Sequence, residues 1–174
     1  MTKITLYLDM DGVLANFDKE YRKYDAQKND RARFRTAVID YKIFEDLELM
    51  PDARQLLDYV ASLVDVNIEI LTSMGTFDPT QGAAAKSQKL VWLAKHGINY
   101  PANFVREKKE KAKYATPNSI LVDDSPGCVD PFISAGGNAI LHASSEKTIS
   151  QLGHTLLLIR ALNALRGLGF EYNE

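Results

Sequence analysis

The sequence predicts an α/β fold: a doubly wound, Rossmann-like, mostly parallel sheet of five strands, with a small helical cap inserted after the first strand. Two observations lead to this prediction. Short apolar runs bounded by polar or turn residues have the form of buried parallel strands. Helical patterns lie between these runs, and strands that alternate with helices form a parallel sheet. The chain has 174 residues, 45% of them apolar, which is enough for one such domain.

The expected strands are short and strongly apolar. The first is the Ile-Thr-Leu-Tyr-Leu run at 4–8, which ends at Asp9. The others lie at 66–71, 104–105, 119–122 and 138–142. Buried parallel strands read as continuous apolar runs of this kind, because both faces of the sheet are covered by helices.

The expected helices follow the strands in turn. Pro51 is suited to a first helical position, and apolar residues recur after it at helical spacing. A second helix is expected at 86–96, closed by Gly97, and a third at 126–135. The last begins at a cap formed by Ser144 or Ser145 and completes the core or forms a dimer contact, so both a monomer and a homodimer remain open.

Residues 16–46 interrupt the alternation of strands and helices. This segment is charged and aromatic, has a helical pattern and contains no strand signal. We interpret it as a small helical cap that folds over the sheet edge. The expected domains are therefore an α/β core of residues 1–15 and 47–174 and a cap of residues 16–46.

Composition and charge exclude several classes of protein. Lys and Arg number 21 and Asp and Glu 23, so the net charge of −2 gives no general attraction to nucleic acid or membrane. Cys128 is the single cysteine, which excludes an internal disulfide, and we interpret it as a packing residue. No apolar stretch approaches a bilayer span and the first residues lack signal-peptide features, so the expected location is the cytoplasm, with no membrane partner.

Polar residues gather where the expected strands end. Asp9, Thr72 and the pair Asp123-Asp124 each follow an apolar run, and Asp11 lies two residues after Asp9. The carboxyl ends of parallel strands share one edge of a sheet, where ligands bind. Each acidic residue alone could be a solvated strand end, but four carboxylates in one place repel one another unless a cation joins them. The set therefore predicts a Mg²⁺ site.

Four motifs in this order resemble those of the haloacid dehalogenase-like superfamily of phosphatases. They are Asp-Met-Asp-Gly-Val at 9–13, Ile-Leu-Thr-Ser at 70–73, Lys113, and Leu-Val-Asp-Asp at 121–124. Within the superfamily the chain is most similar to 5′(3′)-deoxyribonucleotidases, which have a similar first motif followed by a phenylalanine, here Phe17. The expected cap is shorter than in those proteins and lacks their tryptophans, so the resemblance carries over to phosphate chemistry better than to nucleoside recognition.

The resemblance implies a role for each motif residue in catalysis. Asp9 is expected to be the nucleophile that forms an aspartyl-phosphate, and Asp11 the acid and base that serves the leaving group and then the water. Thr72, the Ser73 backbone N–H and Lys113 are expected to bind the phosphate.

The resemblance also implies which residues hold the Mg²⁺ ion. Asp9, Asp124 and the backbone carbonyl of Asp11 are the expected ligands, and Asp123 is expected to act through a water molecule. Which residue of the Asp123-Asp124 pair touches the metal directly is left open.

Other charged residues near the motifs are interpreted as solvated surface. They include Lys86 and Lys89, close to the second motif, although either could assist phosphate binding. The same interpretation applies to the basic residues that precede Lys113, which are Arg106, Lys108, Lys109 and Lys111. Exposed lysines are common, and a charge run is usually a solvated face.

The expected function is a Mg²⁺-dependent phosphatase of 5′ or 3′ nucleoside monophosphates. Phe17 is the candidate substrate contact, with base stacking and helix packing weighted equally. Phosphorylated polynucleotide ends and other small phosphometabolites are alternative substrates for the same chemistry. A phospho-binding module without turnover is the alternative from outside the enzymes.

Overall fold

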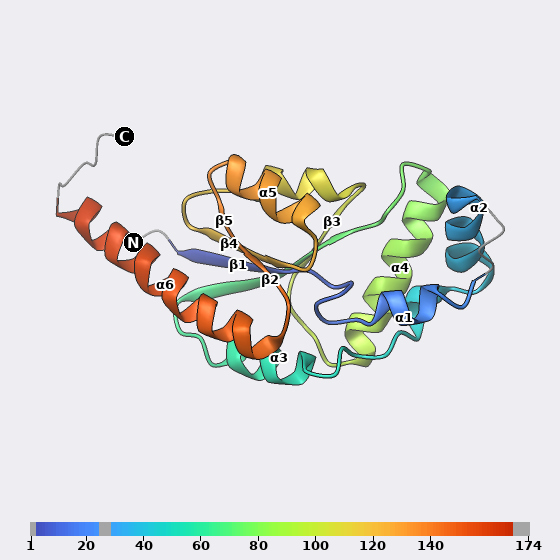
Figure 1. Cartoon of the computed structure of the whole chain (residues 1–174), viewed down its shortest axis with the longest axis horizontal. Helices are drawn as coiled ribbons and strands as arrows, with labels where there is room; N and C mark the ends of the chain where they lie inside the picture. Colours follow the sequence, from blue (N-terminus) through green and yellow to red (C-terminus); the bar gives the residue numbers. More distant parts are fainter. Residues whose placement is uncertain (1–2, 25–28, 169–174) are drawn as a thin grey trace.

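A computed structural model describes residues 3–24 and 29–168, and its centre is a five-stranded parallel sheet (Figure 1). The strand order is β3-β2-β1-β4-β5, and every neighbouring pair is parallel. The strands are β1 (Ile4–Leu8), β2 (Val66–Ser73), β3 (Ala102–Val105), β4 (Ser119–Asp123) and β5 (Asn138–Leu141). The predicted fold class and all five strands are confirmed.

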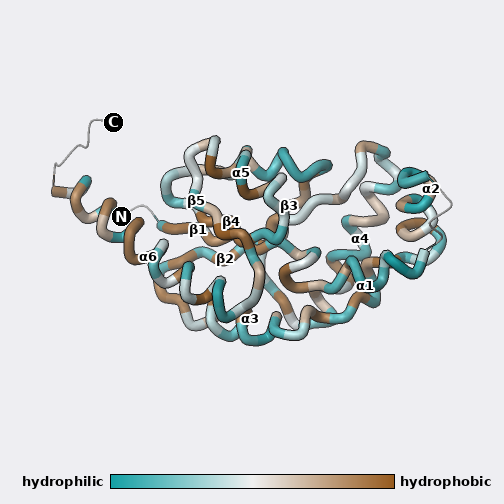
Figure 2. The backbone as a smooth tube through the Cα atoms, in the orientation of Figure 1, coloured by the Kyte–Doolittle hydropathy of each residue, from teal (hydrophilic) through white to brown (hydrophobic). Residues whose placement is uncertain are grey.

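Helices cover both faces of the sheet. On one face α3 (Ala53–Ala61) packs against α6 (Ser145–Gly167), and on the other α5 (Pro126–Ser134) packs against the 3₁₀ segment η3 (Lys108–Tyr114). Strand residues point alternately to the two faces, so Ile120 and Val122 join one apolar cluster and Leu121 joins the other. The apolar strands lie at the centre of the molecule (Figure 2).

In its described residues, the segment predicted as a cap contains four short helical segments. They are α1 (Phe17–Tyr21), α2 (Asp30–Arg35), the π-helical segment η1 (Thr36–Asp40) and the 3₁₀ segment η2 (Ile43–Glu45). Residues 25–28, which the sequence also assigns to the cap, lie outside the described residues.

Helix α4 (Pro79–Lys95) holds the cap in place, and α1, α2 and α4 lie together at one end of the molecule (Figure 1). The Gln88 side chain donates to the carbonyl of Val38 in the predicted cap at 2.7 Å, and the Trp92 indole N–H donates to the carbonyl of Leu47, the first core residue after the cap, at 2.7 Å. Both bonds are buried. The cap is therefore anchored to the helix that follows β2.

Helix α4 begins at Pro79, earlier than the expected start at residue 86. The side chain of Asp78 accepts a hydrogen bond from the Gln81 backbone N–H at 2.9 Å, and Pro79 occupies the first turn. An aspartate cap followed by proline is a strong start signal, and it extends the helix towards the cap. None of the helices in the described part of the chain combines the length and apolarity needed to cross a membrane.

Candidate active site

The strand order brings the polar strand ends together. Strands β2, β1 and β4 are neighbours, and Thr72, Asp9 and Asp123 lie at or just beyond their carboxyl ends. The Asp9 backbone N–H donates to the Val122 carbonyl at 2.9 Å, which continues the β1–β4 pairing to the site. The predicted convergence of these residues is therefore present in the structure.

Asp9 is held in one orientation at the base of a cavity of about 600 Å³. Its Oδ1 accepts the Met10 backbone N–H at 2.7 Å and lies 2.8 Å from the Nζ of Lys111. The residue is 6% exposed, so it is shielded from bulk water but lines the cavity. The Asp9 carboxylate therefore lines the cavity in a fixed orientation.

The structure does not bring Lys113 to this site, as the sequence analysis expected. The Lys113 side chain is 68% exposed and forms an ion pair with Glu110 at 2.9 Å. Lys111, two residues earlier in η3, is buried instead, and its Nζ lies 2.6 Å from Asp123 Oδ2. In a 3₁₀ segment with three residues per turn, positions two apart face different directions, so only one of the two lysines can face Asp9.

Lys111 is a fixed positive charge between two carboxylates. Burial lowers the pKa of its ammonium group, but Asp9 and Asp123 more than compensate and hold that pKa above its ordinary value. Nothing in the basic run distinguishes Lys111 from its neighbours, because the run contains several lysines and no apolar periodicity. Lys111 is identified instead by the three-dimensional path of η3, which brings its side chain to Asp9 and Asp123.

Lys89 is a second buried lysine at the site, and its interpretation as solvated surface is wrong. It is fully buried, and its Nζ donates to Asp11 Oδ2 at 2.6 Å, Thr72 Oγ1 at 2.8 Å and the Ser73 carbonyl at 2.9 Å. A sequence signal was available, because Ala85, Lys89 and Trp92 share one buried stripe of α4.

Asp11 is in direct contact with this lysine through one of its two carboxylate oxygens. Its Oδ2 is bound by Lys89, while its Oδ1 is buried without a hydrogen-bond partner among the described residues. Burial raises the pKa of Asp11, although Lys89 opposes the rise. A buried oxygen without a partner marks a place that a bound group or water fills.

Thr72 and Ser73 differ in their access to the cavity. Ser73 lines it, whereas Thr72 is fully buried and is not part of its wall. The Thr72 hydroxyl accepts from Lys89, and the Ser73 hydroxyl donates to the Arg106 carbonyl at 3.2 Å. The Thr72 hydroxyl is held by Lys89 in this structure, and its contact with phosphate stays a prediction.

Three carboxylates form a group that fits a divalent cation. Oxygens of Asp9, Asp123 and Asp124 lie within 4.8 Å of one another. Opposite oxygens in a Mg²⁺ octahedron are about 4.2 Å apart, so small side-chain rotations suffice. All three donors are oxygens, which Mg²⁺ prefers, and the residues therefore fit this ion. The Asp11 carboxylate is not in the group, and a contact through its backbone carbonyl stays a prediction.

The two adjacent aspartates differ in their free oxygens. Asp123 accepts the Ser125 backbone N–H at 2.9 Å on Oδ1 and Lys111 on Oδ2, so both oxygens are engaged. Asp124 is more exposed, and burial together with Asp9 and Asp123 raises its pKa to about 6. These contacts favour Asp124 as the direct ligand and Asp123 as the residue that positions Lys111.

Gly12 makes room for Asp124. Its φ of +82° lies in the left-handed region, and an added Cβ would lie 2.1 Å from Asp124 Oδ2. Glycine is the residue that permits both this backbone conformation and this approach. The glycine of the first motif therefore allows the acidic group to assemble.

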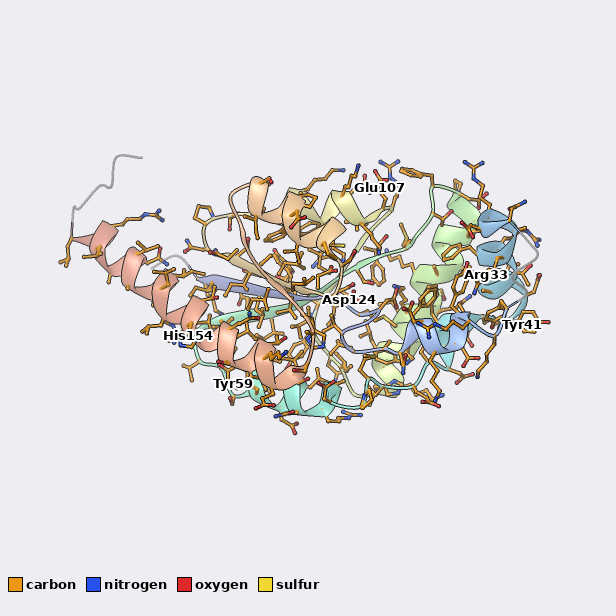
Figure 3. All side chains as sticks on the ribbon, in the orientation of Figure 1. Arg33, Tyr41, Tyr59, Glu107, Asp124 and His154 are labelled. Carbon is orange, nitrogen blue, oxygen red and sulfur yellow. The ribbon has the colours of Figure 1, made fainter. Side chains whose placement is uncertain are left out.

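The cap supplies an aromatic wall to the same cavity. Phe17, Phe34 and Phe44 line it, and the rings of Phe17 and Phe44 are stacked with centroids 5.3 Å apart. Figure 3 shows Asp124 near the middle of the molecule, with the cap residue Arg33 towards one end. Phe17 therefore both packs within the cap and faces the candidate site.

Comparisons with solved structures show the fold. A hydrolase from Streptococcus pneumoniae TIGR4 has a TM-score of 0.56 and 13% identity, covering 88% of this chain and all of that one. An L-2-haloacid dehalogenase from Xanthobacter autotrophicus has a TM-score of 0.50 and 15% identity, covering 92% and 88%. No family model and no curated protein matches the sequence. The chain thus has the α/β fold found in these hydrolases.

Proposed function

We propose that this protein is a phosphatase that hydrolyses phosphomonoesters through a covalent intermediate on Asp9. The observation that carries the proposal is the oriented Asp9 carboxylate, which is bound by Lys111 and faces a cavity that it shares with Asp11 and Asp124. Phosphoryl transfer requires an in-line nucleophile and several positive charges around the phosphoryl oxygens. Lys111 and Lys89 are two such charges, and both are buried.

The reaction has two steps, each assigned to residues of the site. In the first, an Asp9 oxygen attacks phosphorus, the bond from phosphorus to the ester oxygen breaks, and Asp11 gives a proton to the departing alcohol. In the second, Asp11 takes a proton from water, whose oxygen attacks the phosphorus of the aspartyl-phosphate. Inorganic phosphate leaves and the Asp9 carboxylate is restored.

Mg²⁺ is the cofactor that we propose for the three-carboxylate group. When bound, it would offset the negative charge of the carboxylates and of the phosphoryl oxygens. Asp9 and Asp124 would hold it with the Asp11 backbone carbonyl, while Asp123 keeps Lys111 in place through the contact at 2.6 Å.

Nucleoside monophosphates, with the phosphate at the 5′ or the 3′ position, are the proposed substrates. A cavity of about 600 Å³ is of the size that binds small organic ligands. Its wall carries the Phe17, Phe34 and Phe44 rings, and aromatic side chains stack on nucleobases without strong preference for one base.

The fold alone does not distinguish a phosphatase from a dehalogenase, because an L-2-haloacid dehalogenase has a similar fold. The choice rests on Asp11, which supplies the proton that an alcohol leaving group needs and a halide does not. It rests also on the cation-binding acidic group, which suits a substrate that brings further negative charge.

Hydrolysis assays with purified protein test the proposal. We expect Mg²⁺-dependent release of inorganic phosphate from nucleoside monophosphates and none of halide from 2-chloropropionate. Asp9→Asn should abolish turnover with the fold intact, and the matched exposed control Asp130→Asn should retain it. Mass spectrometry of acid-quenched Asp11→Asn should find a phosphoryl group on Asp9. Full activity of Asp9→Asn would refute the mechanism, and phosphate binding without turnover in the wild type would indicate a binding module.

A further inference from the structure

One wall of the active-site cavity carries a concentration of charge that the mechanism above does not use. The segment between β3 and η3 places four consecutive charged residues in the cavity lining: Arg106, Glu107, Lys108 and Lys109. In Figure 3, Glu107 lies above Asp124 and the cap residue Arg33 lies to its right. The four consecutive residues are exposed, as expected for a solvated face, and they also line the cavity.

The cations of this wall are not equivalent, because Arg106 is already neutralised. Its Nη2 lies 3.0 Å from Glu110 Oε1, its backbone N–H donates to Glu110 Oε2 at 2.8 Å, and its guanidinium lies 5.4 Å from the Phe77 ring centroid. Within residues 3–24 and 29–168, neither Lys108 nor Lys109 forms an ion pair with a carboxylate. These two lysines, offset in part by Glu107, are the charges left for a ligand.

Lys108 is exposed, and a contact with Ser125 places it near the acidic group. Its Nζ donates to Ser125 Oγ at 3.2 Å, and Ser125 follows Asp124 directly. The proposed function assigns the buried cations Lys111 and Lys89 to the scissile phosphate. Both lie outside the cavity lining, where they are held by the carboxylates of Asp9, Asp123 and Asp11. Lys108 and Lys109 lie in the lining itself, and they suit a second anionic group on the same substrate.

The other nearby cavity offers fewer cations to such a group. That cavity, of about 670 Å³, adjoins the first at Phe34 and Phe77. Its wall carries Asp30 and Asp78 against the single cation Arg31. A phosphate placed there would meet one cation beside two carboxylates, whereas Lys108 and Lys109 lie together on one segment of the first cavity.

Building on the proposed phosphatase function, we propose that Lys108 and Lys109 bind a second phosphate of the substrate. The preferred substrates are then nucleotides that carry another phosphate close to the scissile one. Two sources share this chemistry: a free nucleoside 3′,5′-bisphosphate, and the phosphorylated end of a nucleic-acid strand, in which the next phosphodiester is the second group. Both have the aromatic base for which the cap wall is suited.

The test compares three substrates: thymidine 5′-monophosphate, thymidine 3′,5′-bisphosphate and 5′-phosphorylated dithymidylate. For the wild type we expect kcat/KM for at least one two-phosphate substrate to exceed that for the monophosphate about tenfold, the effect of one added charge-assisted contact. Preference for the bisphosphate alone identifies free nucleotides as the source, and preference that includes the dinucleotide identifies strand ends. The double variant Lys108→Gln/Lys109→Gln should bring the ratio close to one.

Lys113→Gln is the matched control, since Lys113 belongs to the same basic run but lies outside the cavity, and it should keep the wild-type ratio. Equilibrium titration of the Asp9→Asn protein with the same compounds should give the same order of affinities without turnover. A ratio near one in the wild type, or a ratio unchanged in the double variant, overturns the second-phosphate site while monophosphate hydrolysis stands. Failure to hydrolyse any of the three substrates overturns the proposed function itself.

Discussion

The Nζ of Lys89 lies 2.6 Å from the Oδ2 of Asp11, although the two residues are 78 positions apart. Lys89 is fully buried, and the same ammonium group also contacts Thr72 and the Ser73 carbonyl. The proposed general acid is therefore positioned by a helix of the β2–β3 connection. This pair and the Lys111 contacts lead to the first two predictions.

Removal of the Lys89 charge should impair the proton-transfer role of Asp11. Lys89→Met keeps the length of the side chain but leaves the buried Asp11 carboxylate without its cation, so the pKa of Asp11 should rise further. We expect kcat to fall by about 10²–10⁴-fold, the usual contribution of general acid–base catalysis. The measurement is the pH profile of kcat, whose limb for deprotonation of Asp11 should move to higher pH. Lys86→Met, a nearby exposed lysine on the same helix, is the control.

The two lysines of η3 should behave in opposite ways. Lys111→Met should lower kcat/KM by about 10²–10³-fold, as removal of one preorganised charge-stabilising donor does. It should also destabilise the fold, because the buried Asp123 loses its partner. Lys113→Met removes only an exposed ion pair and should change kcat/KM less than about twofold. The reverse order of effects would restore the assignment made from sequence.

Substitution of the adjacent aspartates should distinguish the direct metal ligand. Asp124→Asn is expected to raise the Mg²⁺ concentration for half-maximal activity at least about tenfold. Asp123→Asn should instead lower the melting temperature, because Lys111 is left buried beside a neutral amide. Magnesium titrations and thermal unfolding with EDTA measure the two effects. An unchanged Mg²⁺ requirement in Asp124→Asn would contradict its placement as a ligand.

Gly12→Ala should weaken metal binding through steric conflict. The added Cβ would lie 2.1 Å from Asp124 Oδ2, so the carboxylate must move away from Asp9. Gly136→Ala is a matched control, since Gly136 has a similar φ of +87° but no atom within 4 Å of an added Cβ. Both variants should lose some stability from backbone strain, and only Gly12→Ala should lose Mg²⁺ affinity, by about 10–100-fold. Calorimetric titration with Mg²⁺ measures the difference.

Stability should carry a pH dependence that comes from His142. Burial lowers the pKa of this imidazole, although Asp52 opposes the shift, and its Nδ1 lies 2.9 Å from Thr148 Oγ1. A histidine with a depressed native pKa binds protons more readily when unfolded, so the free energy of unfolding should fall as pH drops through and below about 6.5. The raised pKa of Asp124 acts with the opposite sign in this range.

The contribution of His142 is therefore measured as the difference in pH-dependent stability between the wild type and a His142 variant. Denaturant unfolding of wild type and His142→Gln between pH 7 and 5 should show a steeper loss of stability in the wild type. Equal slopes would remove His142 as the cause.

The sheet and the acidic group could be predicted from the sequence because both follow from where the strands begin and end. Apolar runs define the strands, and parallel neighbours necessarily bring Asp9 and Asp123 to one edge. The lysines could not be predicted in the same way, since their long side chains can reach the site from several backbone positions. Lys111 differs from Lys113 only through the path of η3, which no periodicity in the sequence records.

Helix α4 provides a mechanical connection between substrate access and chemistry. Gln88 of this helix bonds Val38 of the predicted cap, and the next residue, Lys89, reaches the proposed general acid. A displacement of the cap that pulls on this helix would also withdraw the ammonium group from Asp11. Access to the cavity from the cap side and the position of the proposed general acid therefore depend on the same helix.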